Sequence, residues 1–373
     1  MSEKKKRRNP DWWILITVGL LLAVGIIMVF SSSQYFAKYE PYNDTYYFLK
    51  EQAGNIFVGL IAMVFAYKVN LRVYYRLAWP VYIGICALLL VMVVLSELGL
   101  LESAGGASRW LVVAGFNFQP SELAKIALPL LLARRLSDTR EYAEDFRYSF
   151  LPALGLLILP CVLIVAGRDL SSAVVVGATG VIMLFCGGIL VRYLLMTFAM
   201  GAAGIAAAIA LFPFRMDRIY AWFDPWEYAQ DEGFQAVQSL MALGSGGLSG
   251  VGLGAGGSKW FYLPERHTDF IFSVLGEELG FLGGVFLILL FAVLVWRGIL
   301  TAVRCKNTFA SLLAMGLICS IAVQALVNLG VVTGLLPVTG VTLPFISYGG
   351  TSMVVTLTMV GVILNVSRYR DRI

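Results

Sequence analysis

The chain has 373 residues, of which 59% are hydrophobic and 14% are charged, and its formal net charge is +5. This composition excludes an ordinary soluble domain and predicts an all-α integral membrane protein. The basic residues are informative through their distribution along the chain, and a nucleic-acid partner is not expected. Five cysteines are scattered through apolar runs without a CxxC pair, so we expect neither a zinc site nor a disulfide framework.

The first ten residues, 1–10, form a basic tail in which every residue from Lys4 to Arg8 is basic. The apolar run that follows, from Trp12 to Phe30, is long enough to span a bilayer. It lacks the small-residue cleavage site of a secretory signal peptide. We therefore expect a first transmembrane helix that is preceded by a cytoplasmic tail.

Ten apolar runs follow one another along the chain, and each predicts a transmembrane helix. They are Trp12–Ser31, Asn55–Tyr67, Leu77–Leu95, Pro120–Leu132, Ser149–Ala166, Ser172–Gly188, Val191–Phe212, Asp269–Gly298, Phe309–Leu335 and Phe345–Val366. The whole chain, residues 1–373, is predicted to be a single polytopic membrane domain.

The basic residues predict the orientation of these helices. Most of the 28 Lys and Arg residues lie in the basic tail or in the segments after the second, fourth, sixth, eighth and tenth spans. Because such residues favour the cytoplasmic side, we expect both termini in the cytoplasm. The large loop at residues 213–268, between the seventh and eighth spans, then lies outside, as do Glu97–Gln119 and Leu336–Ser352. No large cytoplasmic domain remains to bind a nucleotide, so chemistry is expected at the outer face.

The stretch from Leu336 to Ser352 combines proline, glycine and hydroxyl residues between two apolar runs. In lipid, irregular backbone persists only where protein or a water-filled cavity satisfies its N–H and C=O groups. This stretch therefore predicts a polar pocket at one membrane face.

Asp269 lies where the large outer loop meets the eighth span, beside Phe270 and Phe272. An ionisable side chain at a membrane boundary is a candidate general base. Alternatively, Asp269 is an acid at a helix N-terminus, favoured by the helix dipole, with Thr268 as the N-cap. Its position in the sequence does not separate these two interpretations.

Glu122 and Lys125 open the fourth span three residues apart, on one helical face. They form either an internal ion pair or a phosphate-binding cation whose position Glu122 fixes. Arg109, beside Trp110 in an outer Gly/Ser-rich stretch, is a second candidate phosphate ligand.

Two further patterns carry less functional weight. Gly252–Gly257 matches the spacing G-x-G-x-x-G, but no strand-turn-helix unit surrounds it, so we reject a dinucleotide site. These glycines are expected to let the Gly244–Gly257 loop pack closely against helix ends, or move. His267 is the only histidine, so no metal triad can be built around it, and we expect it at the surface near Asp269.

The chain resembles the SEDS family (shape, elongation, division and sporulation), which includes proteins of the FtsW and RodA type. The resemblance rests on Leu336–Ser352 and on motifs that occur in family order over nearly the whole chain. These motifs are Arg109-Trp110, Gln119–Lys125, Gly233–Ser239 and Pro264–Phe272. Gly340–Pro344 looks more like the division and sporulation branch than the elongation branch. Family members commonly have Pro-Asp-Leu-Gly where this chain has Arg168–Ser171, so the turn around Asp169 is expected to differ.

The resemblance implies a peptidoglycan glycosyltransferase that polymerises lipid II on the outer face of the cytoplasmic membrane. In the mechanism it implies, Asp269 is the general base on the acceptor's GlcNAc 4-hydroxyl, and undecaprenyl pyrophosphate leaves with inversion at the anomeric carbon. The departing pyrophosphate needs cationic stabilisation, for which Arg109, Lys125 and Lys259 are candidates. Glu122, Asp169 and Ser347 would shape the cavity. No organic cofactor is expected, and a divalent cation such as Mg or Mn is a further source of positive charge.

The implied partners are a class B penicillin-binding protein and other division or sporulation membrane proteins. Two alternative functions stay open at this stage. A lipid II flippase would distribute its polar groups across the depth of the membrane. A scaffold for the transpeptidase would function without Asp269.

Overall fold

The computed structural model describes residues 9–39, 42–99, 111–113, 116–210, 213–257 and 263–369. Within these ranges the long helices are α1 (Trp12–Ala37), α2 (Tyr47–Lys68), α3 (Leu71–Glu97), α4 (Pro120–Asp138), α5 (Leu151–Ala166), α6 (Leu170–Cys186), α7 (Val191–Ala210), α10 (Ile271–Val303), α11 (Thr308–Val332) and α12 (Gly350–Ser367). Two shorter helices, α8 (Pro213–Phe223) and α9 (Phe234–Ser245), lie in the large loop between α7 and α10.

Among the described residues, 8 helices are long and apolar enough to cross a membrane. The chain is therefore a multi-pass membrane protein with a helical fold. Two of the predicted spans do not meet the same criteria. One is α6, which has 17 residues, and the other is α4, which carries Glu122 and Lys125 in its first turns and Arg134 and Arg135 near its end. The count of ten spans stays a prediction.

A two-stranded antiparallel ribbon precedes α4, and it was not expected from the sequence. Strand β1 (Leu111–Val113) pairs with β2 (Phe116–Phe118), with Val112 opposite Asn117. The ribbon belongs to a connection outside the apolar runs, so the helical bundle itself is as predicted.

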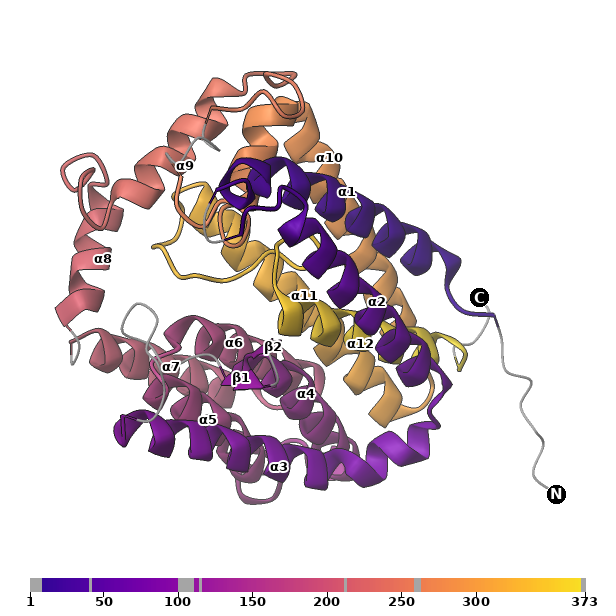
Figure 1. Ribbon diagram of the computed structural model, residues 1–373. Helices are drawn as coiled ribbons and strands as arrows, with labels where there is room; N and C mark the ends of the chain where they lie inside the picture. Colours follow the sequence, from indigo (N-terminus) through magenta and orange to yellow (C-terminus); the bar gives the residue numbers. More distant parts are fainter. Residues whose placement is uncertain are drawn as a thin grey trace.

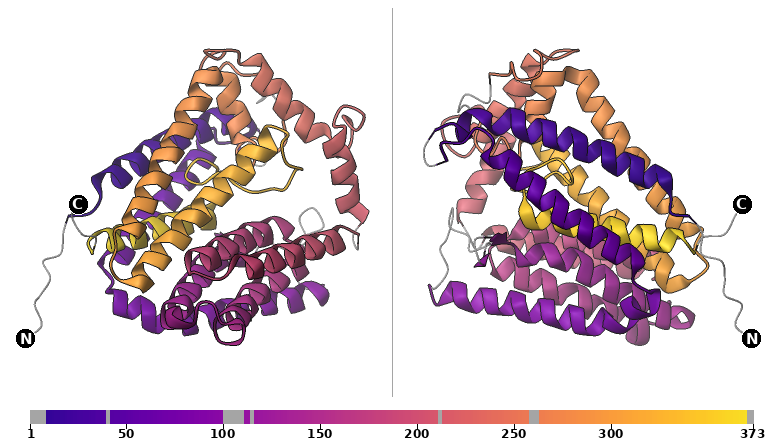
Figure 2. Two further views of the ribbon diagram at one scale, coloured as in Figure 1. Left: turned by 180° about the vertical axis from the view of Figure 1, so that it is seen from behind. Right: turned by 45° about the vertical axis from the view of Figure 1, so that its right-hand side comes forward.

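The bundle has two groups of helices. In Figure 1, α3 to α7 lie together on one side, and α1, α2, α10, α11 and α12 lie on the other. Contacts between α4 and α11 join the two groups. Helices α8 and α9 follow one edge of the molecule from α7 towards α10, which Figure 2 shows from two further directions.

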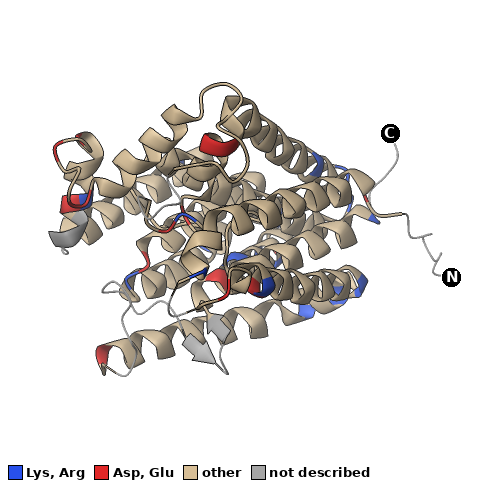
Figure 3. Cartoon of the chain, turned by 45° about the horizontal axis from the view of Figure 1, so that its top comes forward, with Lys and Arg blue, Asp and Glu red and all other residues tan. Residues whose placement is uncertain are grey.

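The start of α1 and the end of α12 are in contact at one end of the bundle. The backbone N–H of Asp11 donates to the Ser367 hydroxyl at 3.2 Å, and the Asp11 carboxylate accepts from the Arg297 guanidinium at 2.6 Å. Several Lys and Arg residues gather at this same end (Figure 3). Both observations agree with the predicted placement of the two chain ends on one side of the membrane.

Helix α10 is interrupted at Gly280, whose φ of 68° lies in the left-handed region. The glycine-rich loop after α9 supplies the hydrogen bonds that the break releases. The Phe281 N–H donates to the Gly247 carbonyl at 2.9 Å, and the Val251 N–H donates to the Glu277 carbonyl at 3.0 Å. Backbone groups of the loop therefore replace the hydrogen bonds that α10 cannot form across its break.

Close packing explains the glycines of this loop. A Cβ added at Gly250 would lie 2.2 Å from the Glu278 carbonyl oxygen, and one added at Gly246 would lie 2.0 Å from the Gly276 carbonyl oxygen. The interpretation of Gly244–Gly257 as a loop that packs closely against a helix is confirmed.

Candidate functional site

The stretch from Leu336 to Ser352 forms an irregular connection between α11 and α12, and two amides on α11 hold it. Gln324 Nε2 donates to the Thr342 carbonyl at 2.9 Å, and Asn328 Nδ2 donates to the Val341 carbonyl at 2.6 Å. The exposed fractions of Gln324 and Asn328 are 2% and 1%. These buried amides satisfy backbone groups that no helix or sheet pairs.

This connection forms one wall of a cavity of about 780 Å³. Residues of β2, α2, α4, α6, α8, α9 and α12 and the turn before α10 form the other walls. The described charged residues that line it are Glu51, Glu122, Lys125, Arg218, Glu265 and Asp269. The sequence-based prediction of a polar pocket at this stretch is confirmed.

Asp269 lines the cavity from the turn before α10, and its position is fixed through the backbone. Its carbonyl oxygen accepts from Asn328 Nδ2 at 2.7 Å, and the neighbouring Thr268 carbonyl accepts from the Ser347 hydroxyl at 2.6 Å. The N-cap of α10 is Phe270, and the Thr268 hydroxyl donates to Glu265 Oε2 at 2.6 Å. The interpretation of Thr268 as the N-cap is therefore wrong, because its hydroxyl is committed to the preceding turn.

Glu122 and Lys125 form a buried ion pair in the cavity wall. Lys125 Nζ lies 2.6 Å from Glu122 Oε1 and donates to Gln324 Oε1 at 2.8 Å. Glu122 Oε2 is buried and has no hydrogen-bond partner among the described residues. A buried acceptor of this kind normally finds a partner, so a ligand in the cavity could donate to it. The internal ion pair is confirmed, and a substrate-binding role stays a prediction.

Asp169 lies behind the cavity wall. It is the N-cap of α6, where it accepts from the Ser172 N–H at 3.2 Å, from the Ser121 hydroxyl at 2.9 Å and from Gln119 Nε2 at 3.0 Å. These contacts hold the starts of α4 and α6 together. Asp169 is 5% exposed and is absent from the described residues that line the cavity.

Ser347 also lies behind the wall. Besides donating to Thr268, its hydroxyl accepts from the Leu343 N–H at 2.7 Å. Both hydrogen-bonding capacities of the oxygen thus fix backbone, and the side chain supports the turn that carries Asp269. Two other predicted ligands, Arg109 and Lys259, lie outside the described residues.

His267 is not the surface residue that the sequence suggested. Its ring packs against Phe36, Phe48 and Tyr348, with centroid distances of 6.0, 4.6 and 5.8 Å. Burial in this aromatic cluster lowers the pKa of His267 from its ordinary value of 6.5 to about 4. The imidazole is therefore neutral at physiological pH.

No group of three or more His, Cys, Asp or Glu side chains that could hold a metal ion occurs in the part of the chain that the structure describes. The cavity carboxylates Glu51, Glu122, Glu265 and Asp269 do not gather into such a group. The described side chains thus do not fit a metal site built by protein alone, and the expectation of a divalent cation stays untested.

Three residues of the site escaped the sequence reasoning: Gln324, Asn328 and Arg218. The two amides had a usable signal, because they lie four residues apart on one face of an apolar span, where unpaired polar groups are costly. Arg218 had none, since it lies in the large outer loop among other charged residues.

Comparisons with known proteins show the family of the chain. The model of the FtsW/RodA/SpoVE family, described as "Cell cycle protein", matches residues 11–372. The stage V sporulation protein E of Bacillus subtilis strain 168 is 42% identical over 364 residues, which cover 98% of each chain. A probable peptidoglycan glycosyltransferase FtsW of Geobacter metallireducens is 42% identical over 97% of this chain and 96% of its own.

Two solved structures share the fold. A chain from a study of the structural coordination of polymerization and crosslinking by a peptidoglycan synthase complex superposes with a TM-score of 0.79 at 30% identity, covering 97% of this chain and 99% of its own. The rod shape determining protein RodA of Thermus thermophilus superposes with a TM-score of 0.71 at 29% identity, covering 97% and 98%. With a family model that matches nearly its full length and relatives above 40% identity, the chain belongs to the FtsW/RodA/SpoVE family of cell cycle proteins.

Proposed function

We propose that the chain is a peptidoglycan glycosyltransferase that polymerises lipid II, in the wall synthesis of division or sporulation. One observation carries the proposal: a single cavity of about 780 Å³ brings Asp269 together with the Glu122–Lys125 pair and the Gly340–Thr342 backbone. These groups come from three distant segments, and their convergence at one cavity is what a reaction between two large substrates requires.

In the proposed reaction, Asp269 accepts the proton of the acceptor's sugar hydroxyl. That oxygen forms a bond to the anomeric carbon of the donor, and the bond from this carbon to the phosphate oxygen breaks. The electron pair leaves on the lipid pyrophosphate, and attack from the opposite face inverts the anomeric carbon. One carboxylate suffices, because pyrophosphate leaves without the second acid that glycosidases use.

The other residues act through position and hydrogen bonding. Asn328 and Ser347 fix the backbone on which Asp269 is carried. The free Oε2 of Glu122 accepts from a sugar hydroxyl or an amide N–H of the substrate. Asp169 keeps the starts of α4 and α6 in register, so that Glu122 and Lys125 face the cavity.

We further propose ten spans with both termini in the cytoplasm and the cavity at the outer face of the cytoplasmic membrane. Helix α12 supports this orientation. It begins at the cavity with Gly350 and ends at Ser367, which contacts Asp11. Its 18 residues extend about 27 Å, close to the thickness of a bilayer's hydrocarbon core. This span supports the proposal that the cavity and the chain ends belong to opposite membrane faces.

The position of the cavity favours catalysis over lipid flipping. Its residues on α4, α6 and α12 lie in the first half of each helix, and Asp269 precedes α10. The charged groups thus gather at one end of the bundle, whereas a flippase would carry them across its depth.

We also propose a class B penicillin-binding protein as partner, with other division or sporulation membrane proteins. The solved peptidoglycan synthase complex that contains a similar chain supports this pairing.

The direct test combines the purified protein, its partner transpeptidase and lipid II in liposomes, with crosslinking blocked by a β-lactam. Glycan polymer in the products supports the proposal. Transfer of lipid II between leaflets without polymer would support the flippase, and neither outcome in a folded complex would favour the scaffold.

A further inference from the structure

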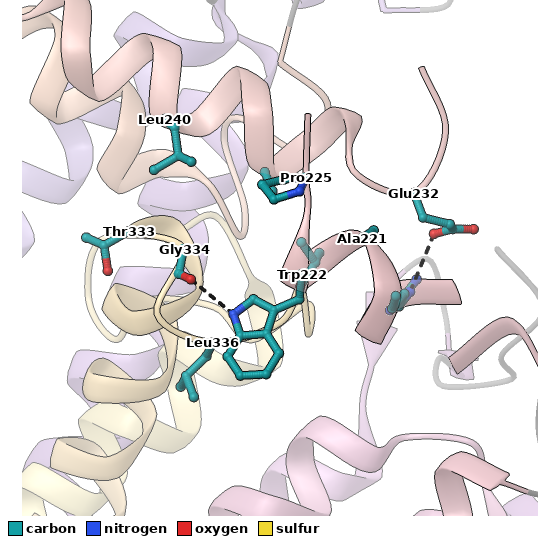
Figure 4. Close-up of a pocket in the computed structure, with 11 residues that line it drawn as sticks. Ala221, Trp222, Pro225, Glu232, Leu240, Thr333, Gly334 and Leu336 are labelled. Carbon is teal, nitrogen blue, oxygen red and sulfur yellow. Dashed lines mark hydrogen bonds and ion pairs between the residues drawn. The ribbon is translucent and has the colours of Figure 1, made fainter. Parts of the chain in front are cut away.

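A second cavity of about 230 Å³ adjoins the first, between α8, α9 and the end of α11. In Figure 4, the Trp222 indole is directed at Gly334. Its Nε1 donates to the Gly334 carbonyl at 3.0 Å, which anchors α8 on the C-terminal end of α11. Of the described residues, Arg218 and Val338 line both cavities. Arg218 therefore lies in the wall between them, on a helix held in place by Trp222.

Arg218 differs from Lys125, the other described basic residue of the main cavity. The Lys125 side chain is 2% exposed and is committed to Glu122 and Gln324. The Arg218 side chain is 39% exposed, and its Nε lies 3.8 Å from Glu232 Oε2, beyond hydrogen-bond distance. Exposed ion pairs of this geometry contribute little to the free energy of folding. Arg218 can therefore exchange Glu232 for another anion at a small cost in free energy.

The proposed reaction requires a cation in the cavity that is not already neutralised by a close carboxylate. Departure of a pyrophosphate leaves negative charge that needs a cation in the transition state. The Lys125 charge is already compensated by Glu122 at 2.6 Å. A guanidinium presents a planar fork that binds two phosphate oxygens at once.

We propose that Arg218 binds the pyrophosphate of the lipid-linked substrate in the main cavity, and that Glu232 holds the side chain when no substrate is present. This inference rests on the proposed function for its choice of ligand. Glu232 faces the second cavity, so the guanidinium moves from one cavity towards the other when it changes partner.

The test measures binding of undecaprenyl pyrophosphate, and of undecaprenol as a lipid without phosphate, to the full chain in nanodiscs. Arg218→Ala and the size-matched Arg218→Gln are expected to weaken binding of the pyrophosphate lipid about 10-fold and to leave undecaprenol unchanged. Arg218→Lys is expected to weaken binding of the pyrophosphate lipid by a smaller factor, because lysine keeps the positive charge without the planar fork. Glu232→Gln is expected to bind equally or more tightly, since it removes the competing anion.

Lys50→Ala is the matched control, because Lys50 is an exposed basic residue paired with Asp44 at 2.7 Å and does not line either cavity. Competition with inorganic pyrophosphate separates recognition of the head group from recognition of the whole lipid. Equal binding of both lipids by the wild type, or equal affinity of wild type and Arg218→Gln, overturns the inference.

The binding result is independent of polymerisation. Arg218-dependent binding in a protein that makes no polymer would reject the proposed function and leave this site in place. If the wild type polymerises lipid II and substitution of Arg218 leaves pyrophosphate binding unchanged, the proposed function stands and the Arg218 site is rejected.

Discussion

The side-chain amide of Asn328 donates to the backbone carbonyl of Asp269 at 2.7 Å and to that of Val341 at 2.6 Å. One buried amide thus joins the turn before α10 to the irregular connection after α11. Asp269 therefore owes its position to a residue 59 positions away in the sequence.

Replacing Asn328 with alanine leaves two buried carbonyl groups without this partner. We expect a loss of about 2–3 kcal/mol in the free energy of unfolding. Because the backbone of Asp269 is released, we also expect polymerisation per folded molecule to fall roughly 10- to 100-fold. Thermal unfolding and glycan-polymer assays measure the two effects.

Asn365→Ala is the matched control for Asn328→Ala. Asn365 Nδ2 donates to the Tyr67 carbonyl at 2.6 Å near the C-terminal end of α12, away from the cavity. It is expected to lose stability to a similar degree and to keep its specific activity. Equal specific activity in both variants would contradict a positioning role for Asn328.

The buried pair of Glu122 and Lys125 predicts a non-additive response to mutation. Lys125→Met leaves a buried carboxylate uncompensated and is expected to cost about 3–5 kcal/mol of unfolding free energy. The double variant Glu122→Gln, Lys125→Met removes both charges and is expected to recover most of that stability, but not polymerisation. Chemical unfolding of the single and double variants in one detergent measures this.

The exposed pair Lys50–Asp44 supplies the comparison for that cycle. Lys50→Ala is expected to change the unfolding free energy by about 1 kcal/mol or less. A Lys125→Met cost as small as this would show that the Glu122–Lys125 pair is solvated.

The break in α10 predicts that Gly280 does not tolerate a side chain. Alanine there would have a φ of 68° and a Cβ 2.3 Å from the Gly250 nitrogen. We expect Gly280→Ala to lower the unfolding free energy by about 3 kcal/mol or more. Gly201→Ala on α7 is the control, because nothing lies within 4 Å of an added Cβ there. Similar thermal unfolding of the two variants would contradict the tight loop contact.

The low pKa of His267 predicts a pH-dependent stability. With a folded pKa of about 4 and an ordinary value of 6.5, the unfolded chain binds a proton between these values that the folded chain does not. Stability is therefore expected to fall as the pH drops from 6.5 towards 4, by about 2–3 kcal/mol. His267→Phe removes this contribution, so the two proteins should diverge only below pH 6.5 in unfolding experiments. Parallel curves over that window would show that the ring is accessible to protons.

Much of the bundle is predictable from sequence because apolar runs identify membrane helices directly. The boundaries are less so. Helix α2 begins at Tyr47 and not at Asn55, because its first turns contain Gln52, a buried polar residue that donates to the Ser347 carbonyl at 3.2 Å. Helix α12 begins at Gly350 and not at Phe345, whose φ of 67° excludes a helix there.

The residues of the site were likewise predictable only in part. Asp269, Glu122 and Lys125, which line the cavity, could be predicted from sequence because charges at span ends are conspicuous in an apolar sequence. The sequence context of Asp169 and Ser347 does not distinguish them from these cavity residues, yet their side-chain oxygens form hydrogen bonds to a helix end and to backbone. Only the folded chain distinguishes a polar group that faces a cavity from one that supports its wall.

The central claim is that Asp269 accepts the proton during glycosyl transfer. The most direct test compares lipid II polymerisation by wild type, Asp269→Asn and Asp269→Ala, each bound to the partner transpeptidase. Glu51→Gln, which changes another carboxylate that lines the cavity, is the control. We predict a loss of at least about 100-fold in both Asp269 variants and near-normal polymer from Glu51→Gln. Wild-type polymerisation by a folded, partner-bound Asp269→Asn would contradict the account.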